Sequence, residues 1–164
     1  MTAELFGDWG KLRNLGQNLE KRLQAELRKA TLKSALLLVR EIKEGIKSQA
    51  PGGVAFAPLA ESTVAHKGSS KALIDTGFLV NAITQKIMKG GTQAFVGLLR
   101  TAMGPKGQNA ANIGAIMEFG ATIKMKNGAT VVIPARPFLH PVMEKHRKTI
   151  QGYYNDALKA VFRV

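Results

Sequence analysis

Apolar residues in the first third of the chain recur at helical spacing. Between Leu12 and Ile46 they lie mostly three or four positions apart, which places them on one face of a helix. The pattern stops at Ser48-Gln49-Ala50, before Pro51-Gly52-Gly53, a sequence that ends helices. Residues 1–50 are therefore predicted to form one long N-terminal helical arm.

The middle of the chain, residues 51–134, predicts a loop-rich α+β core. Short helical patterns cover 61–68, 78–83 and 109–120, and Asp75 or Thr76 is a suitable N-cap for the second of them. Strand patterns cover 85–88, 93–98, 121–125 and 129–133. Gly90-Gly91 and Asn127-Gly128 stand between the members of each pair, so we expect antiparallel hairpins.

The segment from Ile133 to Leu139 joins the last strand to a final helix. Pro134 and Pro137 fix their own φ and push the preceding residues into extended conformation. A helical apolar pattern follows over 138–162, so residues 135–164 form the C-terminal helical segment. The expected fold is α+β in a single domain, 1–164. It has a long N-terminal helix, a four-stranded mainly antiparallel sheet, short connecting helices and a C-terminal helix.

The balance of charge is strongly basic. Lysine and arginine number 24 against 11 acidic residues, a formal net charge of +13, which favours polyanionic partners such as nucleic acid. Ten basic residues lie between Lys11 and Lys47. Their face is either a solvated surface or a surface turned toward DNA, and the candidates for DNA contact are Lys21, Arg22, Arg28, Lys29 and Lys33.

The residues carry no sign of catalysis, and we expect no enzyme activity, cofactor or metal. Cysteine is absent, and neither a phosphate-binding GxxxxGK[ST] loop nor a GxGxxG motif occurs. His140 and His146 are six positions apart, which does not suit zinc chelation from one helix face. The carboxylates that a metal-dependent nuclease would cluster are scattered: Asp75, Glu118, Glu144 and Asp156.

Neither a signal peptide nor an apolar run of about 18 residues occurs, so we expect no membrane contact and synthesis in the cytoplasm.

Several blocks, in order, resemble the bacteriophage virion morphogenesis family, also called tail-completion proteins. Residues 59–68 resemble its lead-in L-S-x-x-T…K-G, and residues 72–79 resemble L-I-D-T-G-x-L. Residues 95–97 and 116–120 resemble its V-G strand and its A-x-I-H-E-F-G segment, although Met117 stands where the family often has histidine. Residues 133–139 resemble I-P-A-R-P-F-L. The resemblance covers residues 59–140, about half of the chain.

The resemblance implies a structural virion protein at the head–tail junction, made in the host cytoplasm. Such proteins form homo-oligomeric rings, here six- or twelve-fold. They contact portal or adaptor proteins and tail-tube or tail-terminator proteins, and surround a channel through which genomic DNA passes. The motif residues implied as structural or intersubunit contacts are Asp75, Thr76, Gly77, Glu118, Phe119, Gly120, Pro134, Arg136, Pro137 and Phe138. The alternative reading is a free-standing basic protein that binds nucleic acid.

Arg136 lies at the elbow of the bend. Without a catalytic constellation around it, the residue is either part of a simple hinge or a structural or intersubunit contact. We expect its guanidinium to pair with a carboxylate or with helix-end carbonyls, Asp75 and Glu118 being the candidate carboxylates.

Overall fold

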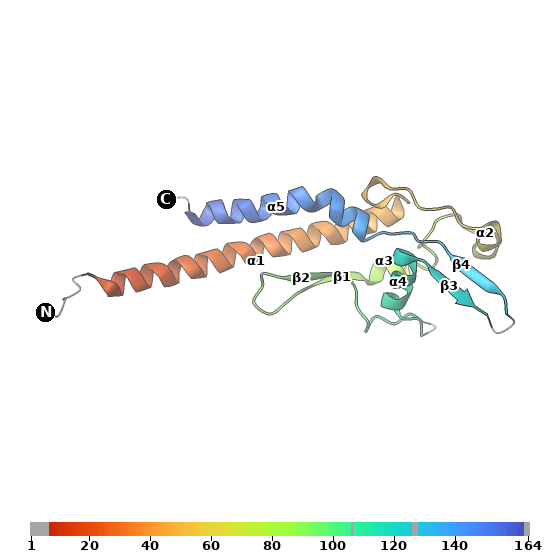
Figure 1. The fold of residues 1–164 in the computed structure, drawn as a ribbon, viewed down its shortest axis with the longest axis horizontal. Helices are drawn as coiled ribbons and strands as arrows, with labels where there is room; N and C mark the ends of the chain where they lie inside the picture. The colour runs from red at the N-terminus through yellow and green to blue at the C-terminus, as the bar shows by residue number, and fades with distance from the viewer. Residues whose placement is uncertain (1–6, 106, 126–127, 163–164) are drawn as a thin grey trace.

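The computed structural model describes residues 7–105, 107–125 and 128–162, and its fold is α+β. Two long helices, α1 (Trp9–Lys47) and α5 (His140–Phe162), run side by side along an elongated molecule (Figure 1). Between them in sequence come short elements: η1 (Pro51–Gly53), α2 (Glu61–Lys67), α3 (Phe78–Ala82), β1 (Ile83–Ile87), β2 (Ala94–Leu98), α4 (Ala110–Phe119), β3 (Ala121–Lys124) and β4 (Thr130–Ile133).

Helix α1 begins at a side-chain cap and ends at a backbone reversal. The carboxylate of Asp8 accepts the N–H of Lys11 at 3.1 Å, which satisfies one of the free amides of the first turn. At the other end, Gln49 adopts a left-handed φ of 62° two residues before Pro51. The predicted long N-terminal helix is confirmed, with Trp9 as its first residue.

The two long helices differ in length, and α1 projects past α5. At 1.5 Å per residue, the 39 residues of α1 span about 58 Å and the 23 residues of α5 about 34 Å. All residues from 7 to 22 are exposed, and we call residues 9–22 the overhang (Figure 1). The leucines predicted to form an apolar helix face are therefore uncovered over the first turns of α1.

Farther along, small side chains let α1 and α5 approach closely. Ala30, Ser34 and Ala35 are buried on α1, and the hydroxyl of Thr31 lies 2.9 Å from the hydroxyl of Tyr154 on α5. This packing makes the helix pair the largest contact between elements of the fold.

A contact between a histidine and a carboxylate also joins the two helices. His146 Nε2 on α5 lies 3.3 Å from Glu41 Oε2 on α1. The Arg40 guanidinium, with a smaller contribution from His146, holds the pKa of the Glu41 carboxyl below its usual value.

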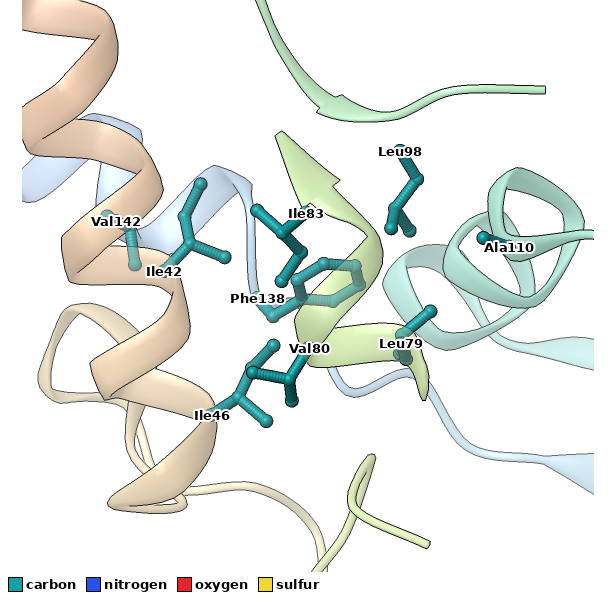
Figure 2. Packing of buried hydrophobic residues seen from close by; sticks show 9 residues of the cluster. All are labelled: Ile42, Ile46, Leu79, Val80, Ile83, Leu98, Ala110, Phe138 and Val142. Carbon is teal, nitrogen blue, oxygen red and sulfur yellow. The ribbon is translucent and has the colours of Figure 1, made fainter. Parts of the chain in front are cut away.

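The hydrophobic core lies where α1, α3, β1, β2, α4 and the start of α5 meet. Phe138 is fully buried and sits in the middle of this cluster (Figure 2). It therefore anchors the segment before α5 against helices from both halves of the chain. The other members are Ile42, Ile46, Leu79, Val80, Ile83, Leu98, Ala110 and Val142.

The predicted four-stranded sheet is wrong, because the strands form two separate two-stranded sheets. Strands β1 and β2 pair antiparallel from Ile83↔Leu98 to Ile87↔Ala94, and β3 and β4 pair from Ala121↔Ile133 to Lys124↔Thr130. The first hairpin packs on α1, whereas the second extends away beyond α4 (Figure 1). Strand patterns identify hairpin partners but do not determine whether two hairpins share an edge. The predicted turn at 126–128 falls partly on residues 126 and 127, which lie outside the described residues.

The predicted N-cap of α3 is also wrong. Gly77, with a left-handed φ of 79°, is the capping residue, and no side chain caps this helix. The Thr76 hydroxyl accepts the N–H of Phe78 at a long 3.4 Å, and Asp75 is exposed. Glycine takes this backbone conformation without the steric penalty that another residue would carry.

Candidate interaction cleft

A buried carboxylate holds the first turn of α5. Glu118, on α4, is 8% exposed and accepts three consecutive backbone N–H groups. Its Oε2 accepts from Phe138 at 2.8 Å and Leu139 at 3.0 Å, and its Oε1 accepts from His140 at 2.9 Å. These amides precede or open the helix and have no partner within it, so an anion there is stabilised by both hydrogen bonds and the helix dipole. Glu118 is thus a helix cap supplied by a different helix.

Arg136 fixes the bend to a loop before α2. Its side chain is buried and donates from Nε to the carbonyl of Ala57 and from a terminal nitrogen to that of Pro58, each at 2.8 Å. Its backbone N–H donates to the carbonyl of Met117 at 2.6 Å. The bend is therefore attached to both α4 and the loop.

The expected partners of Arg136 are therefore corrected. In the part of the chain that the structure describes, its guanidinium forms no ion pair with Asp75 or Glu118. Glu118 is occupied by backbone amides, and the carbonyls that accept from Arg136 belong to an irregular loop rather than to a helix end. A buried arginine is tolerated here because neutral carbonyls accept hydrogen bonds from two of its nitrogens.

These attachments shape the wall of a cleft of about 1130 Å³. Five segments line it: the loop and helix around α2, the segment before α3 with the start of α3, the loop that holds Pro105 and Gln108, part of α4, and β4 with the bend. Its surface is largely apolar, with contributions from Leu59, Leu73, Phe78, Ile113, Met117, Val131, Val132 and Ile133. An apolar concave surface with a few polar groups at its edge is suited to bind another molecule.

The predicted motif residues take three different positions. Asp75, Thr76, Pro134 and Arg136 line the cleft. Phe119 does not line it and is 81% exposed on the outer surface. The remaining motif residues build the fold that surrounds the cleft: Gly77, Glu118, Gly120, Pro137 and Phe138.

Gly120 shows why one of these positions requires glycine. Its φ is 75°, and an added Cβ would lie 2.9 Å from the carbonyl oxygen of Ile133 and 3.0 Å from the amide nitrogen of Ala135. Glycine is needed because the chain at Gly120 passes close to the bend at residues 133–135, which brings the end of α4 against the bend.

The hairpin β3–β4 beside the cleft has apolar side chains in water. Val132 is 68% exposed, and Ile123, Val131 and Met125 are between 41% and 50% exposed. No third strand pairs with it in the described chain. A two-stranded sheet with uncovered apolar faces is marginal by itself, so this surface is suited to be covered by another molecule.

The predicted DNA-facing residues all lie on the exposed surface of α1, in different surroundings. Arg28 donates from Nε to the carbonyl of Gly90 at 2.9 Å, which attaches the β1–β2 turn to α1. Lys29 pairs with Glu26 at 2.6 Å, and the Lys33 ammonium lies 4.0 Å from the centre of the Tyr153 ring. The remaining two, Lys21 and Arg22, are exposed on the overhang. The five positions therefore do not form one uniform basic patch, and their contact with DNA stays a prediction.

The described residues offer neither a metal site nor a membrane-spanning helix. Those residues contain no group of three or more histidine or acidic side chains placed to hold a metal ion. No helix among them is long and apolar enough to cross a membrane.

A family match over most of the chain identifies its relatives. Residues 8–159 match the phage virion morphogenesis family. The chain belongs to that family. The predicted resemblance is confirmed and extends over α1 and most of α5, beyond the 59–140 blocks. The phage virion morphogenesis family is structural rather than enzymatic, and this chain is accordingly a virion morphogenesis protein. Neither the curated proteins nor the solved structures yield a match.

The sequence indicated the motif residues of this phage virion morphogenesis protein but not the cleft that four of them line. The partners of Arg136 are main-chain carbonyls, and no side-chain pattern at Ala57 or Pro58 identifies them. The one signal in the sequence that pointed to the cleft was the set of family blocks, because segments that share a family motif can lie close together in the fold. The lead-in block, 59–68, indeed contributes the α2 wall.

Proposed function

We propose that this chain forms a ring at the head–tail junction of a tailed bacteriophage or phage-like particle. In this role it completes the neck or tail and surrounds the channel for DNA. Its partners are further copies of itself, six or twelve to a ring, with portal or adaptor proteins on one side and tail-tube or tail-terminator proteins on the other. The family supports virion morphogenesis, and the surface of the fold supports assembly.

The uncovered apolar surface beside the family motifs carries this proposal. The cleft and the β3–β4 hairpin lie at the same end of the molecule and share Val131 and Val132. A protein that acts alone rarely leaves such a continuous apolar surface in water. Because the surface contains the family motif residues Asp75 and Pro134, it is a natural place for the contact that members of the family use in assembly.

The net charge of +13 supports a ring that surrounds DNA. Basic residues that contact phosphates bind a duplex without reading its sequence, which suits a channel. Lys21 and Arg22 are exposed and are the two predicted DNA-facing residues for which the described structure shows no intramolecular partner.

Electron microscopy of the purified chain and of virions tests the proposal. The expected result is a closed ring of the purified protein and density for the same ring between head and tail. A chain that stays monomeric at high concentration and occupies no position in the virion contradicts it.

A free-standing nucleic-acid-binding protein is the second candidate, favoured by the same charge. It predicts that the isolated monomer binds duplex DNA with an affinity that falls steeply with salt. Binding of that kind by a chain that never forms rings would support this candidate over the ring.

A further inference from the structure

The overhang carries an apolar stripe that nothing in the described chain covers. Trp9, Leu12 and Leu15 are 56%, 58% and 67% exposed, and Leu19 is 37% exposed. The three leucines are separated by three and four positions, so they lie on one side of the helix. The same side continues into Ala30 and Ser34, which are buried where α5 packs on α1. The stripe is thus an extension of an existing helix-packing face beyond the end of α5.

The cleft offers an apolar surface that could receive this stripe. It is concave and apolar, and its volume of about 1130 Å³ accommodates several leucine-sized side chains. Amphipathic helices commonly bind such grooves through residues spaced by three, four and seven positions. The overhang and the cleft lie at opposite ends of the molecule, so a chain does not fill its own cleft with its own overhang (Figure 1).

Charge at the cleft is mixed, and its carboxylates are the groups that can pair with a basic helix. Among the described carboxylates, Glu61, Asp75 and Asp156 are those without a side-chain hydrogen bond or an ion pair. Two of these three belong to the cleft region, since Asp75 lines the cleft and Glu61 begins α2. The lining also contains His66, Lys67 and Arg136, and the Lys67 ammonium and the Arg136 guanidinium donate to main-chain carbonyls. The overhang instead carries basic residues with no such partner: Arg13, Lys21 and Arg22. Opposite charges at the edge of a contact fix its register and exclude other partners more than they add affinity.

We infer that the overhang of one copy binds in the cleft of the next copy, with its leucines inside and its basic residues facing Glu61 and Asp75. This inference rests on the proposed ring and specifies the contact that builds it. A contact between two different surfaces is heterologous, and repeated around a closing rotation it makes a ring.

Chemical cross-linking tests the contact, since the chain has no native cysteine. The full chain with Leu15→Cys is mixed with the full chain carrying Thr63→Cys, an exposed position in the cleft, and treated with a short bismaleimide. The expected product is a cross-linked pair containing one of each. The matched control replaces Leu15→Cys by Leu36→Cys, an exposed position on α1 outside the overhang, and should give little product. If Leu15→Cys cross-links chiefly to itself, two overhangs pair with each other and the inference is overturned.

A second experiment separates this contact from the ring itself. The triple variant Leu12→Ser, Leu15→Ser, Leu19→Ser is compared with Leu32→Ser, Leu36→Ser by light scattering, with circular dichroism as the measure of folding. The triple variant should stay folded and require at least about tenfold more protein to assemble, and the control should assemble like wild type. Rings of normal size from the triple variant overturn the overhang contact and leave the ring intact. A wild-type chain that forms no ring, alone or in virions, overturns both proposals.

Discussion

The carboxylate of Glu118 accepts the backbone N–H of Phe138 at 2.8 Å across 20 positions of the chain. The same side chain also accepts the N–H groups of Leu139 and His140, so one residue of α4 caps α5. A single side chain therefore joins the family segment that ends at Gly120 to the segment that begins at Ile133.

Replacing Glu118 by glutamine should destabilise the fold strongly. Glutamine offers one acceptor oxygen and turns an NH₂ group toward amides that need acceptors, so at least one buried N–H is left unpaired. The expected loss is about 2–4 kcal/mol of unfolding free energy, measured by urea denaturation. Glu144→Gln, at an exposed position of α5, is the matched control and should change stability by less than about 0.5 kcal/mol. Equal stabilities of the two variants would mean that the cap contributes nothing.

Arg136 should be required for the structure of the bend. The variant Arg136→Ala loses both hydrogen bonds to the loop and should lower unfolding free energy by about 2–4 kcal/mol. Arg136→Lys should recover part of this loss, because a lysine ammonium reaches one carbonyl but lacks the fork of the guanidinium. Thermal melts of the three proteins measure the series. If the alanine variant folds and assembles like wild type, the bend is only a hinge.

Two glycines of α1 should respond oppositely to alanine. At Gly16 nothing lies within 4 Å of an added Cβ, so Gly16→Ala should stabilise the helix by up to about 1 kcal/mol. At Gly45 the added Cβ would lie 2.6 Å from Cα of Pro51, a backbone atom that cannot rotate away. Gly45→Ala should therefore destabilise by about 1–3 kcal/mol despite the better helix propensity. Chemical denaturation of both variants checks the sign, and stabilisation at Gly45 would show that the η1 segment moves freely.

The β3–β4 hairpin should matter for assembly rather than for folding. Val132→Lys replaces a side chain that is 68% exposed, so the unfolding free energy should change by less than about 0.5 kcal/mol. If the hairpin is covered in the ring, the new charge should be desolvated there, and assembly measured by light scattering should be strongly reduced. Val54→Lys makes the same chemical change at a valine that is 56% exposed and does not line the cleft, so that variant should assemble normally. Normal assembly of Val132→Lys would exclude the hairpin from the contact.

The long helices could be predicted from sequence because their apolar period is sustained over many turns. The predicted and observed ends of α5 differ only at its start, where residues 138 and 139 belong to the bend. The hairpins were predicted for a similar reason, since each pair of strands is separated by a glycine-containing turn.

The relative placement of the elements could not be predicted in the same way. Whether two hairpins share a sheet depends on the surface against which each one packs. The β1–β2 hairpin packs against α1. The exposure of Leu12 and Leu15 depends on where α5 ends against α1, which is a tertiary property. The cap formed by Glu118 and the carbonyls bound by Arg136 involve backbone groups, which every residue has and which therefore leave no sequence signal.

The attachments around the bend also have a mechanical consequence. Glu118 joins the start of α5 to α4. Arg136, four positions before α5 begins, joins the bend to the loop before α2. The two walls of the cleft are thus connected to one end of a helix about 34 Å long. A tilt of α5 against α1, produced by any load on the far end of the helix pair, would be transmitted to the cleft as a change in its width.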